Sequence, residues 1–290
     1  MPVRSDLTLE LREMFAGEIS GIENLRHDSD GISVTTVNIK TEEAAKKIGK
    51  PVGSYVTIEI RDLSLPDDRV FERATEAVRQ QLKNIIQLSD ETSVLVVGLG
   101  NQNITPDSIG PKTVNKLIVT RHISKKADSG FNFSLRPVSA IAPGVLGITG
   151  LETGEVIRGV AEHVKPDLII AVDALAARSL RRLGTTVQIS DTGITPGSGV
   201  GNHRKALNEE TLGVKVIAIG VPMVVDAATM AIDVLETVSG NTDERKRENE
   251  MKKLNLPEDN NLLVTPNDVD IISEQASDII AEALNRVLHQ

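Results

Sequence analysis

Strand-length apolar runs constrain the fold of this chain more than any other feature. Leu168–Val172 contains five apolar residues in succession, and comparable runs lie near 94–97 and 215–219. A strand that is apolar on both faces must be covered on both faces, which is typical of parallel sheets packed between helices. Helical segments separate several of the runs. We therefore predict the α/β class, with a mostly parallel sheet and helices on both faces.

The chain can be divided into elements on this basis. We expect core strands at 93–97, 116–120, 167–172 and 215–219. We expect helices at 66–88, 154–164, 174–183, 226–237 and 269–288. The segments 31–39 and 54–60 alternate apolar and polar residues, so we predict two paired, half-exposed strands before the core.

No internal repeat or low-complexity linker divides the 290 residues. We therefore expect a single α/β domain over 1–290. Its first part, 1–65, would be a small β-containing elaboration. Its last part, 241–290, would consist of a charged segment and a C-terminal helix.

Composition excludes several classes of function. The chain has no cysteine, which removes disulfides, thiolate metal sites and cysteine nucleophiles. A net charge of −9 and 2% aromatic residues argue against direct nucleic-acid binding. The charged N-terminus lacks the apolar core of a secretory signal, and no apolar run is long enough to span a bilayer. We expect a cytoplasmic protein without a membrane partner.

Two acids follow predicted core strands. The strand at 93–97 leads into a loop that contains Asp107, and the strand at 167–172 is followed directly by Asp173. Ligand sites of parallel sheets lie beyond the carboxyl ends of the strands, where neighbouring loops converge. We therefore predict that Asp107 and Asp173 lie close together.

Simpler roles for these acids remain open. Both residues stand near the predicted start of a helix, where Asp often caps the first turn. Asp173 fits this role less well, because a carboxylate beside a buried strand is penalised by desolvation unless it is paired or neutralised. Local sequence alone does not decide between capping and catalysis.

Two further kinds of site are also open. Gly98-Leu99-Gly100 begins like a dinucleotide fingerprint, but Asn103 stands where the third glycine belongs. A metal-dependent hydrolase could instead use the same acids, with His122 or His203 as a nitrogen ligand.

Several long motifs carry a family resemblance. They are VGLGNQNITPDSIGP, VTRHI, RPVSAIAPGVLGITGLET, DLIIAVDALAARS and QISDTGITPGSGVGNHRK. The chain resembles the germination proteases of spore-forming bacteria from Val3 to about Asp226. After about residue 240 no motif supports the resemblance.

The resemblance implies an atypical aspartic endopeptidase related to the hydrogenase-maturation endopeptidases. It implies that Asp107 and Asp173 are the catalytic acids, with no cofactor and no metal. It also implies a homotetramer in the forespore or spore core that degrades small acid-soluble spore proteins during germination. Family enzymes are made as zymogens, whereas this chain begins about where the mature family enzyme begins, which leaves zymogen control open.

Substrate binding and oxyanion stabilisation have weaker sequence candidates. The resemblance implies cleavage near a glutamate, and the basic residues that we consider for binding it are Arg121, Lys125, Lys126, Arg204 and Lys205. Backbone N–H groups in 98–100 or 197–201 are candidates to stabilise an oxyanion, because glycine permits close approach.

Overall fold

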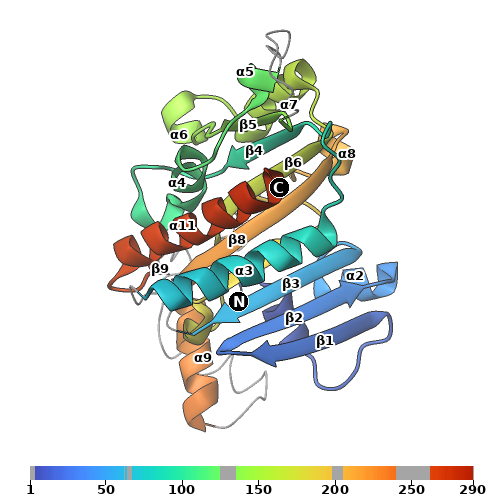
Figure 1. Cartoon of the computed structure of the whole chain (residues 1–290). Coiled ribbons are helices and arrows are strands. Elements are labelled where there is room, and N and C mark those ends of the chain that lie inside the picture. Colours follow the sequence, from blue (N-terminus) through green and yellow to red (C-terminus); the bar gives the residue numbers. More distant parts are fainter. Residues whose placement is uncertain are drawn as a thin grey trace.

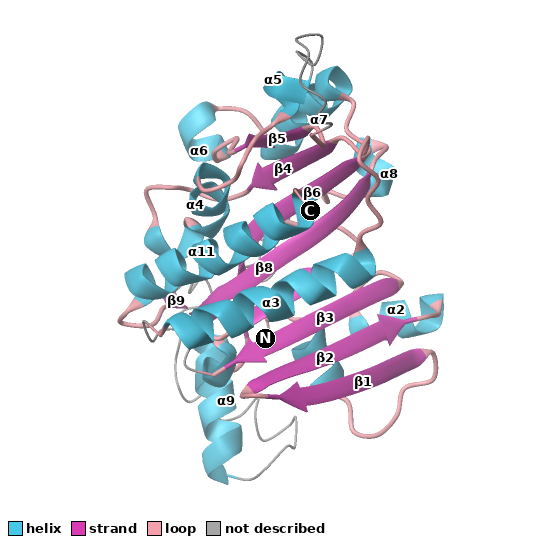
Figure 2. Cartoon of the chain, viewed as in Figure 1, coloured by secondary structure: helices cyan, strands magenta, loops and turns pink. Residues whose placement is uncertain are grey.

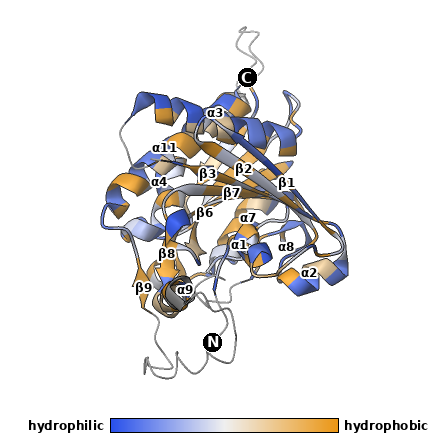
Figure 3. Ribbon diagram, turned by 90° about the horizontal axis from the view of Figure 1, so that it is seen from below, coloured by the Kyte–Doolittle hydropathy of each residue, from blue (hydrophilic) through white to orange (hydrophobic). Residues whose placement is uncertain are grey.

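The computed structural model describes residues 4–61, 63, 67–124, 135–197, 205–239 and 262–289. They form one open, nine-stranded sheet in the order β1-β2-β3-β7-β8-β6-β4-β5, with β9 pairing to β8 (Figure 1). Helices cover both faces of this sheet (Figure 3). The predicted α/β class is therefore confirmed.

One part of the sheet is parallel. Its strands are β4 (Val94–Gly98), β5 (Val138–Ile141), β6 (Leu168–Ala177) and β8 (Lys215–Asp226). Strand β4 pairs with β5 and β6, and β6 pairs with β8. The predicted strands at 93–97, 167–172 and 215–219 are confirmed. Strand β5 was not predicted, because its four residues, VSAI, are too few to show a period.

The other part of the sheet is antiparallel. Its strands are β1 (Ile22–Ser29), β2 (Ile32–Ile39), β3 (Gly53–Ile60), β7 (Thr186–Ser190) and the short β9 (Leu263–Val264). Strand β2 pairs with β3 as predicted, with Val34 opposite Ile58. Strand β7 joins this part to β8, so the N-terminal strands extend the same sheet as the parallel core.

Two sets of helices pack on opposite faces (Figures 2 and 3). One set comprises α3 (Asp68–Ile85), α4 (Ile109–Asn115) and α11 (Val269–Leu288). The other comprises α1 (Thr8–Glu13), α2 (Glu42–Ile48), α7 (Thr153–Val164) and α8 (Glu209–Leu212). Val78 and Leu284 belong to the larger apolar core, and Ile157 belongs to the core on the opposite face. Apolar burial on both faces explains the uninterrupted apolar strands.

The remaining helices are peripheral. They are α5 (Arg121–Ser124), α6 (Leu146–Thr149) and α9 (Ala227–Ser239). Among the described residues, none of the helices combines the length and the apolar character needed to cross a membrane. The charged segment 241–250 lies outside the described residues.

The predicted helix at 174–183 is wrong. Strand β6 continues to Ala177, and its second half pairs with β8 from Asp173 opposite Gly220 to Ala177 opposite Val225. Alanine favours helix in isolation, but pairing and burial in a central strand override that preference. A single turn, η3 (Leu180–Arg182), then leads to β7.

The predicted strand at 116–120 is also wrong. A turn after α4 and a segment without regular secondary structure occupy this region, and more than half of Ile118 is exposed. Polar side chains of α11 hold the segment: Asn285 Oδ1 accepts the Ile118 N–H at 2.9 Å, and Lys116 contacts Glu274. These contacts replace the sheet pairing that the apolar run suggested.

Candidate active site

A cavity of about 280 Å³ lies beyond the carboxyl end of β4. Both predicted acids, Asp107 and Asp173, line it. Apolar side chains form much of the remaining wall: Leu99, Ile104, Val145, Leu175, Val224 and Leu263. The structure thus brings together two carboxylates that are far apart in sequence, in a hollow with few other charged groups.

Asp173 belongs to a strand rather than to a loop. Strand β4 ends at Gly98 opposite Val172, so Asp173 is the first residue of β6 beyond the pairing with β4. On the other side of β6, Asp173 pairs with Gly220 of β8. Asp173 is 5% exposed. The Asp173 Oδ1 atom accepts the Ala174 N–H at 2.9 Å. We expected Asp173 to follow the end of its own strand, but β6 continues to Ala177. Asp173 instead lies just beyond the end of the neighbouring strand β4.

Asp107 is held by the loop that leaves β4. It ends a short turn, η1 (Thr105–Asp107), just before α4. Its Oδ2 accepts the Asn101 N–H at 2.8 Å, and its main-chain oxygen accepts the same N–H at 3.0 Å. No side chain caps α4, so the observed role of the carboxylate is to close the loop, not to cap the helix. Ser108 anchors the turn on α11 through a hydroxyl contact of 3.0 Å to Ser273.

Glycines in this loop allow backbones to approach closely. Gly100 has φ +107°, and a Cβ there would collide with the main-chain oxygen of Asp107. A Cβ on Gly98 would collide with Gly110 of α4. The two glycines of Gly98-Leu99-Gly100 are therefore explained by close packing against Asp107 and α4. In a dinucleotide fingerprint the glycine loop leads directly into a helix, whereas here α4 starts only at Ile109.

Asp6 is a third carboxylate in the cavity wall. Its main-chain N–H donates to the Ala176 oxygen at 2.8 Å, and its Oδ2 accepts the Ala176 N–H at 2.9 Å. Sequence reasoning missed this residue. No local pattern connects a residue near the N-terminus with a strand some 170 positions later.

The edge of β6 faces the cavity between these contacts. Val172 accepts the Leu99 N–H at 2.8 Å and Ala176 pairs with Asp6, so both residues direct main-chain groups away from β8. Because main-chain groups alternate along a strand, those of Ala174 point the same way. Ala174 also lines the cavity. A short strand edge therefore lies beside the two acids.

The other predicted site residues lie elsewhere or outside the described residues. His122 is exposed in α5. The residue just before this helix, Thr120, donates its N–H to the main-chain oxygen of Val138 at the start of β5. Val138 pairs with Val94 at the start of β4, so His122 lies at the opposite end of the parallel strands from Asp107. Arg121 shares that helix, and Lys205 is exposed and does not line the acid cavity.

The residues outside the described parts are Lys125, Lys126, 198–202, His203 and Arg204. Within the described ranges, no three His, Asp or Glu side chains converge closely enough to hold a metal ion together.

Comparisons with known proteins identify the family of this chain. The family model described as germination protease matches residues 7–255. The germination protease of Clostridium perfringens strain SM101 is 47% identical, over 99% of this chain and 95% of that protein. The germination protease of Bacillus subtilis strain 168 is 38% identical, over 99% of this chain and 94% of that protein. This chain belongs to the germination protease family.

Proposed function

We propose that this protein is an aspartic-type endopeptidase in which Asp107 and Asp173 activate water. Membership of the germination protease family makes it a peptidase, a hydrolase with a role in spore germination. The observation that carries the aspartic mechanism is that both acids line one cavity, at the strand ends where parallel sheets place their sites.

The proposed mechanism follows from two carboxylates that line one largely apolar cavity. Two like charges at short range do not both ionise readily, so the pair shares one proton and titrates as a unit. The ionised acid removes a proton from water as the water attacks the peptide carbonyl. The protonated acid donates a hydrogen bond to the carbonyl oxygen and then assists protonation of the leaving amine.

Main-chain groups of the cavity would position the substrate. The strand edge at Ala174 offers a carbonyl to an extended peptide, as in other complexes that add a strand to an open edge. For the oxyanion, the Leu99 N–H is already donated to Val172, which leaves the Gly100 N–H as a candidate beside Asp107. Gly197 also lines the cavity and is a second candidate.

Family membership supports the biological setting that we propose. The substrates are small acid-soluble spore proteins, whose degradation begins at germination in the forespore or spore-core cytoplasm. The active protein is a homotetramer. We retain a single peptidase domain over 1–290, because one sheet includes both the N-terminal strands and the strands that carry the acids.

Conservative substitutions of the two acids test this function. We expect Asp107→Asn and Asp173→Asn each to lower kcat for cleavage of a small acid-soluble spore protein by at least about 100-fold, since each removes one member of an acid–base pair. Circular dichroism checks folding, and Asp90→Asn, at a carboxylate that is 82% exposed, is the matched control. Near-wild-type kcat in either folded variant would refute the dyad. Chelator treatment separates the metal alternative, because only a metal enzyme would lose activity and regain it with added zinc.

A further inference from the structure

An apolar turn lies beside the acid cavity, between β5 and α7. It comprises residues 144–151, including the single-turn helix α6, and we call it the α6 loop. Val145 of this loop lines the acid cavity, and so does Thr153 at the start of α7. The loop is part of the long motif RPVSAIAPGVLGITGLET, to which the proposed water attack assigns no role.

The α6 loop exposes large apolar residues. Leu146 is 42% exposed, Ile148 60% and Leu151 54%, and α6 lies at the margin of the molecule (Figure 1). Ile104, in the loop after β4, lines the acid cavity and is 51% exposed. Apolar surface that remains open beside a cavity indicates a place where something else binds.

Hydrogen bonds attach the α6 loop to the rest of the protein only at its ends. Main-chain N–H groups of 148–150 donate to the oxygens of Val145 and Leu146 at 2.8 to 3.0 Å. The Thr153 hydroxyl donates to the Gly144 oxygen at 3.2 Å, which ties the two ends together. In the described parts of the chain, no hydrogen bond joins the loop to a strand or to a helix other than α6 and α7.

Glycines at both ends allow the loop to change its backbone conformation. Gly144 has φ +77° and Gly150 has φ +72°, a region that glycine adopts readily. A Cβ on Gly150 or Gly147 would meet no atom within 4 Å. Close packing therefore does not explain these two glycines, as it explains Gly98 and Gly100. Residues of this kind can serve as hinges of a loop that closes over a site.

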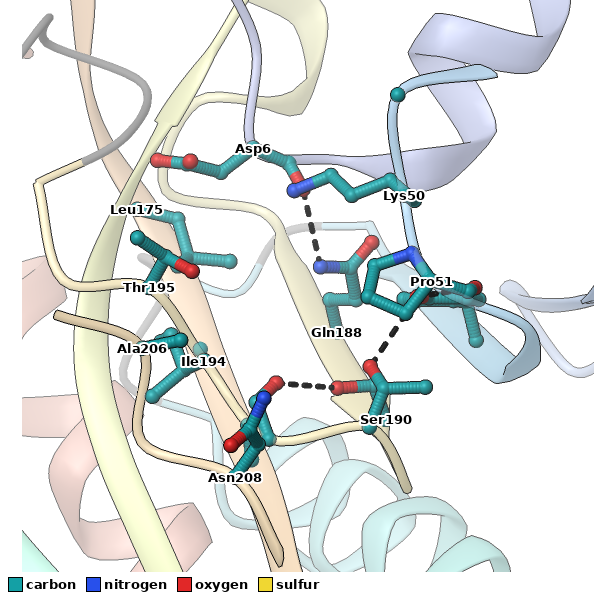
Figure 4. Close-up of a pocket in the computed structure, with 16 residues that line it drawn as sticks. Asp6, Lys50, Pro51, Leu175, Gln188, Ser190, Ile194, Thr195, Ala206 and Asn208 are labelled. Atoms are coloured by element: carbon teal, nitrogen blue, oxygen red, sulfur yellow. Dashed lines mark hydrogen bonds between the residues drawn. The ribbon is translucent and has the colours of Figure 1, made fainter. Parts of the chain in front are cut away.

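The wall of the acid cavity beside the antiparallel strands is fixed by comparison. Asp6 exchanges two hydrogen bonds with Ala176, and its main-chain oxygen accepts the Gln188 amide at 3.2 Å (Figure 4). Leu175, which Figure 4 shows in the same wall, is 5% exposed. Closure of the cavity therefore depends on the α6 loop.

We propose that the α6 loop is a flap that closes over the peptide bound in the acid cavity, with Gly144 and Gly150 as its hinges. This inference rests on the proposed peptidase function and adds a moving part to it. Closure buries the three exposed apolar residues of the loop against the peptide, which favours the closed state. It also excludes bulk water from the two acids, which strengthens their electrostatic interactions with the reacting groups.

A single tryptophan can report on the flap, because the chain has none of its own. During turnover of a tryptophan-free substrate above its KM, we expect the emission of Ile148→Trp to shift to shorter wavelength and to become protected from acrylamide. Both changes should reverse as the substrate is consumed. The matched control is Leu25→Trp, at a residue that is 56% exposed in β1, at the opposite edge of the sheet from β5, and it should show neither change.

Ile148→Ser tests the same closure through kinetics. Ile148 is mostly exposed in the free protein, so the urea midpoint of unfolding should stay at the wild-type value. The value of kcat/KM for a small acid-soluble spore protein should fall roughly 10-fold, because the closed flap loses buried apolar area. Leu25→Ser, the matched control, should leave both quantities unchanged.

Each outcome bears on a different claim. Unchanged emission of Ile148→Trp during turnover overturns the flap, and so does a wild-type kcat/KM in Ile148→Ser. A smaller oligomer of Ile148→Ser in analytical ultracentrifugation also overturns it, because that result shows that the loop forms a contact between copies of the chain. Absence of cleavage of a small acid-soluble spore protein by the wild-type protein refutes the proposed function itself.

Discussion

The parallel and antiparallel parts of the sheet contribute in different ways to two adjoining cavities. One is the acid cavity, and the second, of about 190 Å³, shares Asp6 and Leu175 with it. The parallel part carries Asp173 in β6 and Asp107 in the loop after β4. The antiparallel part and the helices beside it carry Lys50, Tyr55, Gln188 and Ser190. Carboxylates therefore gather where parallel strands end, whereas donor groups gather where the N-terminal strands join β8.

This difference separates two tasks in physical terms. Parallel strands bring loops from distant parts of the sequence to one edge, which allows two acids to share a hollow. The antiparallel strands form a rigid wall, whose side chains are held by hydrogen bonds within the protein. We infer that changes in the parallel part alter turnover, whereas changes in the antiparallel part alter stability or substrate choice. The following predictions test whether effects on kcat and effects on stability separate in this way.

The largest effect is expected for Arg182, which ties the N-terminal elements to the sheet. Its buried guanidinium contacts Glu13 of α1 at 2.5 Å and Glu59 of β3 at 2.9 Å, and it approaches the buried Glu10. Arg182→Met leaves these carboxylates without their cation, so we expect a loss of about 3 kcal/mol in the free energy of unfolding, measured in urea. Where the variant is folded, kcat should stay unchanged. A fall in kcat would contradict the separation of tasks.

The pKa of Tyr55 measures how well the antiparallel part of the sheet shields this side chain from water. Burial raises the pKa of Tyr55 to about 12, although the hydrogen bond from Thr192 opposes the shift. The chain has one tyrosine and no tryptophan, so phenolate absorbance follows Tyr55 alone. We expect a midpoint near pH 12 in the folded protein and about 10 in urea.

The sign of the stability effect follows from this shift. Above about pH 10 the unfolded chain releases a proton that the folded chain retains, so Tyr55 makes folding less favourable as the pH rises from 10 to 12. Below pH 10 its contribution is fully present. A folded-state midpoint near pH 10 would show that water reaches the Tyr55 side chain in the wall of the second cavity.

A methyl group at Gly100 tests the parallel part. Gly100→Ala places a Cβ against the main-chain oxygen of Asp107 at a φ that disfavours alanine. Displacement of Asp107 should lower kcat for peptide cleavage by roughly 30-fold, since catalytic geometry tolerates little misplacement. The pKa of Tyr55 should stay near 12, because Gly100 does not line the second cavity. A fall in the pKa of Tyr55 together with kcat would show that a change in one cavity is transmitted to the other.

Sequence predicted the elements in which periodicity and burial agree. Apolar runs gave the strands around Leu95, Ile170 and Ile217, and convergence of strand ends gave the pair Asp107 and Asp173. It failed where tertiary contacts decide: the alanine-rich segment 174–177 pairs with β8, and Ile118 is held by Asn285.

The second cavity lay beyond sequence reasoning for a similar reason. Lys50 and Asp6 are separated by two strands and two helices, and only the folded sheet brings them to one hollow. The sequence did not single out Lys50, because nothing local distinguishes this half-buried lysine from the exposed lysines of α2.

The smallest effect is expected for Gly159→Ala, which makes the same chemical change as Gly100→Ala on a helix that covers the parallel part. Gly159 lies exposed in α7, and a Cβ there meets no atom within 4 Å. Alanine restricts the unfolded chain and favours helix, so the free energy of unfolding should rise by about 0.5–1 kcal/mol. Because α7 packs through Ile157 and Ala161, on the side away from the exposed Gly159, kcat should not change. If kcat also fell here, the loss in Gly100→Ala could not be assigned to the position of Asp107.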